Sequence, residues 1–241
     1  MRKAYSSGNF AHVPMMVGAT SADIGGKSGF MIAGARDAAA AIADKGVPTW
    51  EYRFSYVADS VGQPGAQHAS DIPFFLDTQA VKYGDKTTPR DNQVGDTISR
   101  YLVNFAKTGD PNGGSLPGWP RYTRDGDQIM DFSAEGKAVA GRDPWGKEIE
   151  AGKARLSQAT ASGRYTTMTT PLGTLLDTPA AKAVLERQVP DVLANPRIGM
   201  ARGMTLQALQ SYVPTLTTEK LRAIDAALAG VAVPAASAAD E

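Results

Sequence analysis

The sequence predicts an α/β protein: a doubly wound, mostly parallel sheet followed by a small all-α domain. Two observations lead to this prediction. Segments typical of strands alternate with segments typical of helices over residues 1–156, whereas only helical patterns follow residue 171. Such alternation is the pattern of chains that form a parallel sheet with helices on its faces.

Three strands are expected in the first part of the chain. Residues 13–18 are a short apolar run, which suits a strand buried on both faces. In residues 49–57 four aromatic side chains alternate with mostly polar residues, which is the period of a strand. Residues 128–132 indicate a third, short strand.

Two helices are expected between these strands. Residues 30–45 are rich in alanine and end at Gly46, a combination that predicts a helix. Residues 91–107 place Val94, Ile98 and other apolar side chains on one face, with Asp91 as the expected cap and Gly109 after the end.

The chain changes character near residue 157. Residues 157–170 are rich in Ser, Thr, Ala and Gly and are expected to form a linker. Residues 171–231 are expected to form a helical module, with helices that begin near Thr178, Thr205 and Thr217. The tail, residues 232–241, has almost nothing to bury and is expected to be disordered.

Composition excludes several classes of function. The 25 basic and 25 acidic side chains cancel, so charge gives no reason to expect nucleic acid as a partner. The absence of cysteine excludes disulfides and thiolate chemistry, and two histidines are too few for a histidine-rich metal site. No Walker or EF-hand spacing occurs, and neither a cofactor nor a metal is expected, although a carboxylate site for calcium or magnesium stays open.

Nothing in the sequence predicts a membrane span, because no apolar run reaches about 18 residues. The start of the chain, residues 1–8, is basic but lacks the apolar stretch of a signal peptide, so none is expected. The localisation of the protein stays open.

Asp23 and His68 are the candidate catalytic residues. Asp23 follows the first predicted strand, and His68 follows the aromatic one. Because the carboxyl ends of parallel strands meet at one edge of a sheet, we expect both side chains at that edge. A histidine that accepts a proton and a carboxylate that orients it are two members of a hydrolytic triad.

Five segments resemble the type B carboxylesterases, the family that includes the cholinesterases. Residues 65–75, G-A-Q-H-A-S-D-I-P-F-F, are similar to the histidine motif of that family. Residues 17–25 resemble its acid loop, with Asp23 at the position of the acid, and residues 48–57 resemble the strand before the histidine. Residues 98–112 and 116–122 resemble its closing segment, so the resemblance covers roughly residues 8–156.

The resemblance implies that residues 1–156 are the C-terminal part of an α/β-hydrolase domain. It further implies a serine esterase that hydrolyses small carboxylic esters through an acyl-enzyme, with His68 as general base and acid and Asp23 as its orienting carboxylate. Full-length relatives are often secreted or periplasmic.

The chain departs from the family pattern in two ways. It contains no G-x-S-x-G nucleophile turn and none of the oxyanion-hole glycines that precede it. The family also usually places extra helices between acid and histidine, and here that insert is short. The isolated chain is therefore expected to be inactive. The alternative interpretation is a catalytically inactive hydrolase fragment that acts as a binding or interaction domain.

Other features have structural interpretations. Asp71 resembles a family acid near the histidine, and a role in holding that loop is favoured over catalysis. Residues 171–228 resemble a small helical module appended to some bacterial secreted hydrolases. Met200 and Met204 are expected in the core of this module, and an accessory or docking role for their region is the alternative. Apolar surface along residues 13–17 and 50–56 is expected to lie bare, so that the chain self-associates through an exposed sheet edge.

Overall fold

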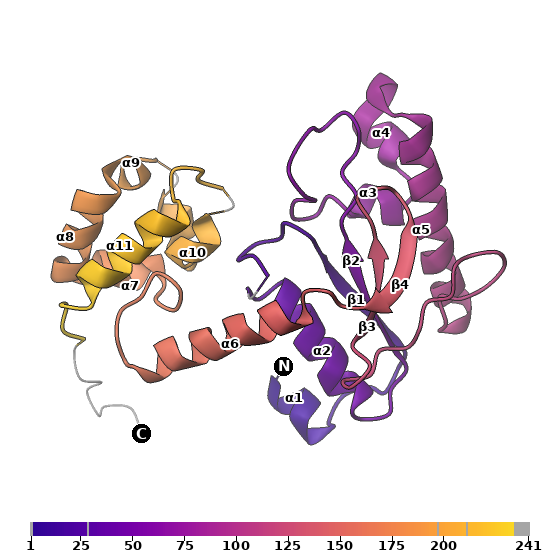
Figure 1. Ribbon diagram of the computed structural model, residues 1–241, viewed down its shortest axis with the longest axis horizontal. Helices are drawn as coiled ribbons and strands as arrows, with labels where there is room; N and C mark the ends of the chain where they lie inside the picture. Colours follow the sequence, from indigo (N-terminus) through magenta and orange to yellow (C-terminus); the bar gives the residue numbers. More distant parts are fainter. Residues whose placement is uncertain (1, 28, 197, 211, 234–241) are drawn as a thin grey trace. The chain divides into compact units, whose positions relative to one another are not determined.

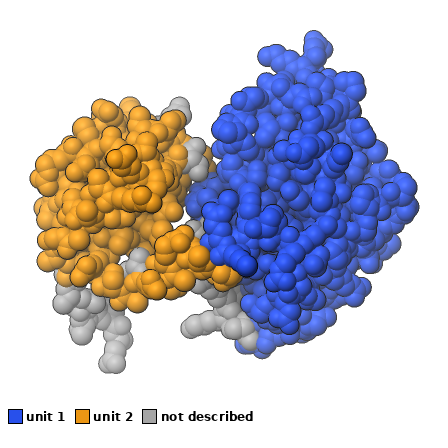
Figure 2. Space-filling view, in the orientation of Figure 1, with its two compact units in different colours: residues 1–149 blue, residues 150–241 orange. Residues whose placement is uncertain are grey.

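The computed structural model describes residues 2–27, 29–196, 198–210 and 212–233. It divides the chain into two compact units (Figure 2): unit 1 comprises residues 1–149 and unit 2 comprises residues 150–241. Residues 234–241, most of the expected disordered tail, lie outside the described part of the chain.

Unit 1 is built on a four-stranded sheet with the strands in sequence order (Figure 1). Its strands are β1 (Met15–Thr20), β2 (Thr49–Phe54), β3 (Gln128–Phe132) and β4 (Ala138–Arg142). The first three strands are parallel, and β4 pairs antiparallel with β3. The mixed α/β fold with a mostly parallel sheet is therefore confirmed, and β4 is a strand that the sequence pattern did not predict.

Helices cover both faces of the sheet (Figure 1). On one face α2 (Ile32–Ala43) packs against Val17 and Ala19 of β1. On the other face α3 (Ile72–Phe75) and α5 (Pro89–Thr108) enclose the aromatic side chains of β2. The remaining short helices of unit 1 are α1 (Arg2–Ser7), α4 (Gln79–Tyr83) and η1 (Gly84–Lys86).

Helix α5 begins two residues before the position that the sequence predicts. Thr88, rather than Asp91, is the N-cap residue, and Pro89 occupies the first turn. The Thr88 side chain accepts from the backbone N–H of Asp91, and the Asp91 carboxylate accepts from the backbone N–H of Thr88 at 2.8 Å. This capping box satisfies two backbone donors that the helix itself cannot pair. Gly109 ends the helix in the left-handed conformation, as expected.

The expectation that residues 50–56 lie bare is wrong. Trp50, Phe54 and Tyr56 are completely buried because α3, α5 and Trp119 pack over them. The Trp119 indole N–H donates to the Glu51 carbonyl at 3.0 Å and so fixes that cover to β2. Exposed apolar surface lies instead near β1, where Val13 is 62% exposed. Among the described strands, β1 pairs only with β2.

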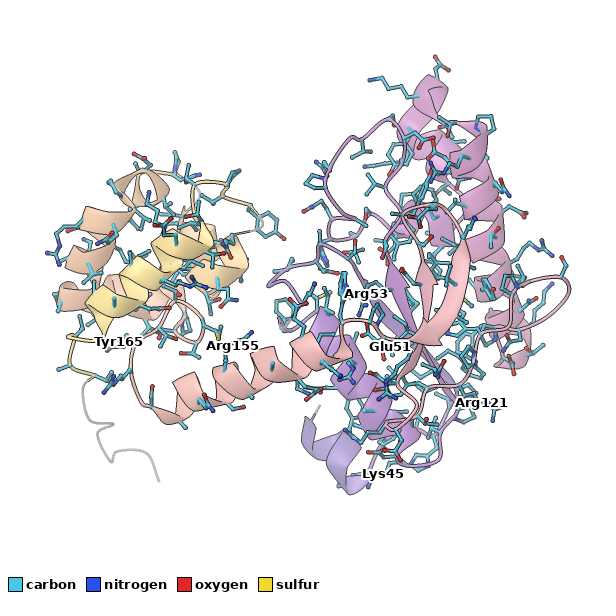
Figure 3. The ribbon with its side chains drawn as sticks, viewed as in Figure 1. Lys45, Glu51, Arg53, Arg121, Arg155 and Tyr165 are labelled. Atoms are coloured by element: carbon cyan, nitrogen blue, oxygen red, sulfur yellow. The ribbon has the colours of Figure 1, made fainter. Side chains whose placement is uncertain are left out.

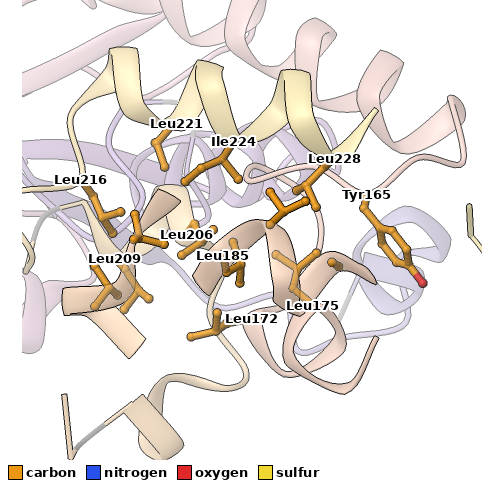
Figure 4. Packing of buried hydrophobic residues seen from close by; sticks show 14 residues of the cluster. Tyr165, Leu172, Leu175, Leu185, Leu206, Leu209, Leu216, Leu221, Ile224 and Leu228 are labelled. Carbon is orange, nitrogen blue, oxygen red and sulfur yellow. The ribbon is translucent and has the colours of Figure 1, made fainter. Parts of the chain in front are cut away.

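Unit 2 consists of helices around one apolar cluster (Figure 4). Helix α6 (Gly146–Ala161) begins in unit 1 and continues past the division between the units. The other elements are α7 (Leu172–Asp177), α8 (Pro179–Gln188), α9 (Pro190–Leu193), η2 (Ile198–Ala201), α10 (Leu206–Leu209) and α11 (Thr218–Leu228). Leu172, Leu185 and Ile224 are fully buried in this cluster, and Met204 packs against it. The side chain of Met200 lies outside the described part.

The segment expected to be a linker is ordered at both ends. Residues 157–161 continue α6, and Tyr165 is buried in the cluster of unit 2. The Asp225 carboxylate accepts from the backbone N–H and the hydroxyl of Thr167, at 2.6 and 3.0 Å. Composition alone predicts a linker for this segment, whereas in the structure Thr167 pairs with Asp225 of α11. The helix expected over residues 205–213 is shorter and comprises only Leu206–Leu209. Thr178 occupies the N-cap position of α8, but its hydroxyl donates to the Thr174 carbonyl and makes no capping hydrogen bond.

Among the described residues, no helix combines the length and the apolar character that crossing a bilayer requires.

Candidate active site

Parallel pairing of β1 and β2 brings two loops to the same edge of the sheet. Thr20 and Phe54 are register partners at the ends of the two strands, and the backbone N–H of Ser21 donates to the Phe54 carbonyl at 2.8 Å. The chain after β1 leads to Asp23, and the chain after β2 leads to His68.

Backbone and side-chain hydrogen bonds join these two loops. The backbone N–H of Ala22 donates to the Ala66 carbonyl at 2.8 Å, and Ala22 and Gln67 form an isolated parallel bridge. The Ser21 hydroxyl oxygen accepts from the backbone N–H of Ala66 at 3.0 Å. Gly65 has φ +86°, and a Cβ atom there would lie 3.0 Å from the Ala22 side chain. Glycine thus permits the close approach of the loops.

Asp23 is held by four hydrogen bonds and is only 2% exposed. Its Oδ2 accepts from the backbone N–H and the hydroxyl of Thr20, at 3.1 and 2.9 Å. Its Oδ1 lies 2.8 Å from the backbone nitrogen of Ile24 and 2.8 Å from His68 Nδ1. The carboxylate therefore has a fixed position from which it can orient the imidazole ring.

His68 presents one ring nitrogen to Asp23 and keeps the other available. With Nδ1 bound to the carboxylate, Nε2 is the nitrogen that can accept a proton from a nucleophile. The His68 side chain is 44% exposed, and no hydrogen bond to Nε2 occurs among the described residues. The structure thus brings together both residues that the sequence proposes for catalysis.

Asp71 anchors the other end of the histidine loop. Its Oδ2 accepts from the Tyr52 hydroxyl at 3.0 Å, which joins the start of α3 to β2. Burial raises the pKa of the Asp71 carboxyl, and the hydrogen bond from Tyr52 offsets part of that effect. The contact supports the structural interpretation of Asp71. Tyr52 as its partner could not be identified from the sequence, because the pairing depends on how α3 packs on the sheet.

A small cavity lies beside this loop. Its volume is about 30 Å³, and residues that line it include Ala66, Ser70, Phe74 and Tyr83. The Ser70 hydroxyl is buried and has no hydrogen-bond partner among the described residues. A cavity of this size holds one water molecule, whereas small-molecule sites commonly reach about 300 Å³ or more. It is not a binding pocket for an ester.

No group of three histidine, aspartate or glutamate side chains in the described ranges is placed to hold a metal ion.

Asp23 is a buried carboxylate and His68 a half-exposed histidine, on loops that follow neighbouring parallel strands. The acid and the histidine of an α/β-hydrolase have this arrangement, so the two residues are candidates for those roles. Residues 26–147 match the sequence profile of the Carboxylesterase family, and the chain belongs to this family. The match includes His68 and begins three residues after Asp23.

Individual relatives are similar over shorter stretches. The chain is 34% identical to carboxylesterase 4A of Bos taurus over 84 residues, which are 33% of this chain and 15% of that protein. It is 33% identical to carboxylesterase 5A of Felis catus over 91 residues, 34% of this chain and 16% of that protein. It is 32% identical to the acetylcholinesterase of Gallus gallus over 107 residues, 40% of this chain and 13% of that protein. The chain thus spans between 13% and 16% of the length of these relatives.

Backbone strain next to His68 leads to a stability prediction. Ala69 has φ +64°, a left-handed conformation that costs a residue with a Cβ atom about 1–2 kcal/mol. Glycine removes this cost but adds roughly 0.4–1 kcal/mol of unfolded-state entropy. Ala69→Gly should therefore raise the free energy of unfolding by about 0.5–1 kcal/mol in urea titrations. Tryptophan fluorescence reports on unit 1, because all three tryptophans lie there.

The matched control is Ala80→Gly, at an exposed position in α4, which should lower the free energy of unfolding by up to about 1 kcal/mol. If Ala69→Gly destabilises unit 1 as much as Ala80→Gly does, residue 69 does not adopt the left-handed conformation in solution.

Proposed function

We propose that unit 1 supplies the acid and the histidine of a serine esterase that hydrolyses carboxylic esters. The observation that supports this most strongly is the 2.8 Å contact between His68 Nδ1 and the buried Asp23 carboxylate. Membership of the Carboxylesterase family supports ester hydrolysis as the reaction.

The roles of the two residues follow from their geometry. His68 Nε2 takes the proton of a serine hydroxyl as that oxygen attacks the ester carbonyl, and then delivers the proton to the leaving alcohol. Asp23 keeps Nδ1 protonated and stabilises the imidazolium that forms. Water then attacks the acyl-enzyme while Nε2 takes its proton, and the return of that proton to the serine oxygen releases the carboxylic acid.

The nucleophile must come from polypeptide outside these 241 residues, because no G-x-S-x-G turn occurs among them. Among the described strands, β1 forms an edge of the sheet, because it pairs only with β2. A strand added parallel to β1 would end at the same edge as Asp23 and His68. Without such a strand, we propose that copies of the chain self-associate through β1.

The second candidate function is a hydrolase fragment that acts as an interaction domain. The small size of the cavity beside the histidine loop favours it, since that cavity is too small for an ester. An in-frame G-x-S-x-G turn encoded upstream of Met1 would favour the esterase. Its absence from the encoding DNA would favour the interaction domain.

We also propose that residues 171–231, together with Tyr165 and Thr167, form a small all-α domain that folds by itself. Arg155 and Arg164 are exposed on either side of the end of α6. Limited trypsin digestion should therefore leave a resistant fragment that begins at Tyr165. In Arg164→Gln the resistant fragment should begin upstream, after Arg155. Degradation of residues 165–231 as fast as residues 150–164 would contradict an independent domain.

The esterase proposal predicts that the 241-residue chain alone is inactive. It should neither hydrolyse p-nitrophenyl esters at an enzymatic rate nor take up a fluorophosphonate label, because no activated serine and no oxyanion hole are present. One oxyanion-hole donor alone contributes about 3 kcal/mol to transition-state stabilisation.

A known serine esterase labelled in parallel is the positive control. Stoichiometric labelling of a serine in this chain that is lost in His68→Ala would show that the chain contains its own nucleophile and would overturn the proposal.

A further inference from the structure

Five charged side chains lie between the sheet and helix α2, on the face opposite the aromatic core of unit 1. We call them the buried charge cluster: Arg36, Glu51, Arg53, Asp127 and Asp143. Glu51 is 2% exposed. Arg53, Asp127 and Asp143 are at most 5% exposed. Glu51 and Arg53 come from alternate positions of β2 and are labelled in Figure 3.

Two ion pairs account for four of the five charges. Arg53 donates two hydrogen bonds to the Asp143 carboxylate, at 2.7 and 2.9 Å, and its guanidinium lies 4.0 Å from the centre of the Trp145 ring. Arg36 donates to both carboxylate oxygens of Asp127, at 3.0 and 2.8 Å. Each arginine is thus matched by one aspartate in a two-point contact.

Glu51 is the fifth member, and no described cation forms an ion pair with it, since Arg53 pairs with Asp143 and Arg36 with Asp127. Its Oε2 is buried without a hydrogen-bond partner. The register places Glu51 opposite Val17 of β1, an apolar neighbour. An ionised Glu51 would give the cluster three negative charges against two positive ones, and a buried charge without a partner is costly.

Further groups on this side of the sheet do not pair with Glu51. Asp131 of β3 is the register partner of Arg53 and accepts from the Ser55 hydroxyl at 2.7 Å. The Tyr122 hydroxyl donates to Asp127 Oδ1 at 3.4 Å. Lys27 lies 4.4 Å from the Trp145 ring and pairs with Glu148. None of these supplies the missing positive charge at Glu51.

We infer that Glu51 is a neutral carboxylic acid in the folded protein, so that unit 1 takes up a proton when it folds and is destabilised at alkaline pH.

The direction of the effect follows from linkage between protonation and folding. Burial, together with the nearby Asp143 carboxylate, raises the pKa of Glu51 from 4.5 to about 8, and Arg53 and Arg36 offset part of this rise. Below the lower value Glu51 is protonated whether the chain is folded or not. Between the two values only the folded state keeps the proton, so the free energy of unfolding decreases as the pH rises. This decrease is complete once the pH exceeds the folded-state pKa of about 8.

Two other carboxyls of this region also titrate. Burial raises the pKa of Asp131, which gives a pH dependence of the same sign. For Asp143 burial is opposed by the hydrogen bonds and charge of Arg53, and its pKa is lowered, which gives the opposite sign. Both remain in a Glu51 variant, so the difference between that variant and the wild type reports the titration of Glu51 together with its coupling to the neighbouring charges.

The consequence reaches the candidate catalytic residues. Glu51 lies on the strand that leads to His68, and its neighbour Val17 lies on the strand that leads to Asp23. An alkaline solution that opens the sheet at this point also separates the two loops.

The test is thermal unfolding of the full chain at about pH 6 and about pH 9, followed by tryptophan fluorescence. The comparison is between the wild type, Glu51→Gln, which is isosteric and neutral, and Glu135→Gln, which changes an exposed glutamate. From the lower to the higher pH, the Tm of each protein is compared with its own starting value. The decrease in Tm should be larger for the wild type and for Glu135→Gln than for Glu51→Gln, by roughly 5 °C or more. At the higher pH Glu51→Gln should be at least as stable as the wild type.

Superimposable pH profiles for the wild type and Glu51→Gln would overturn the inference. So would a Glu51→Gln variant that is less stable than the wild type at the higher pH, because an ionised and paired carboxylate would explain that result. Should Glu51→Gln fail to fold, infrared spectra of the wild type with carbon-13-labelled glutamate decide the question. The carbonyl stretch of a protonated carboxylic acid should be present at neutral pH. It should disappear as the pH rises above the Glu51 pKa of about 8. Its absence at neutral pH would also overturn the inference.

Discussion

The parallel pairing of β1 with β2 is the constraint on which unit 1 depends. Six register pairs, from Met15↔Thr49 to Thr20↔Phe54, end the two strands at the same level of the sheet. The next hydrogen bond, from Ser21 to Phe54, continues the ladder into the loops. A shift of one residue would turn every side chain of β2 to the opposite face and would separate Asp23 from His68.

Strand β2 serves two environments that differ in chemistry. Its even-numbered positions, with Trp50 and Phe54, fill the aromatic core under α5. Its odd-numbered positions place Glu51 and Arg53 under α2, where ion pairs replace apolar packing. Arg53 is matched by Asp143, whereas Glu51 is not matched. The register of β2 is therefore set on one face by apolar burial and on the other by pairing of charges, and both faces oppose a shift of the strand.

Local patterns were sufficient to predict several elements of unit 1. The strands at 49–54 and 128–132 and the end of α5 at Gly109 follow from alternation, β-propensity and glycine. The start of α5 was misplaced because two possible caps, Thr88 and Asp91, stand three residues apart and form one capping box. The composition of residues 157–170 does not reveal the contact between Thr167 and Asp225, because these two residues are distant in sequence.

The sequence predicts the candidate site as two residues at one edge of the sheet, but not the contacts that hold their loops together. The chain order of Asp23 and His68 and the resemblance of their loops were sufficient to select them. The joining of the loops through Ser21 and Ala66, and the anchor between Tyr52 and Asp71, depend on tertiary packing and leave no local signal. The alternation of aromatic and polar residues in β2 is typical of a strand with one face exposed to solvent. Helix α2 covers that face, and the sequence gives no sign that Glu51 is buried without a partner.

The central claim is that Asp23 fixes His68 with the proton on Nδ1 and with Nε2 open. Nitrogen-15 NMR of the histidine side chains, at a pH at which His68 is neutral, tests it directly, because the two ring nitrogens have different shifts when protonated and when not. The account predicts the Nδ1–H tautomer for His68 in the wild type and its loss in Asp23→Ala, with His12 unchanged as the internal reference. A neutral His68 that carries its proton on Nε2 in the wild type, or a tautomer that Asp23→Ala leaves unaltered, would contradict it.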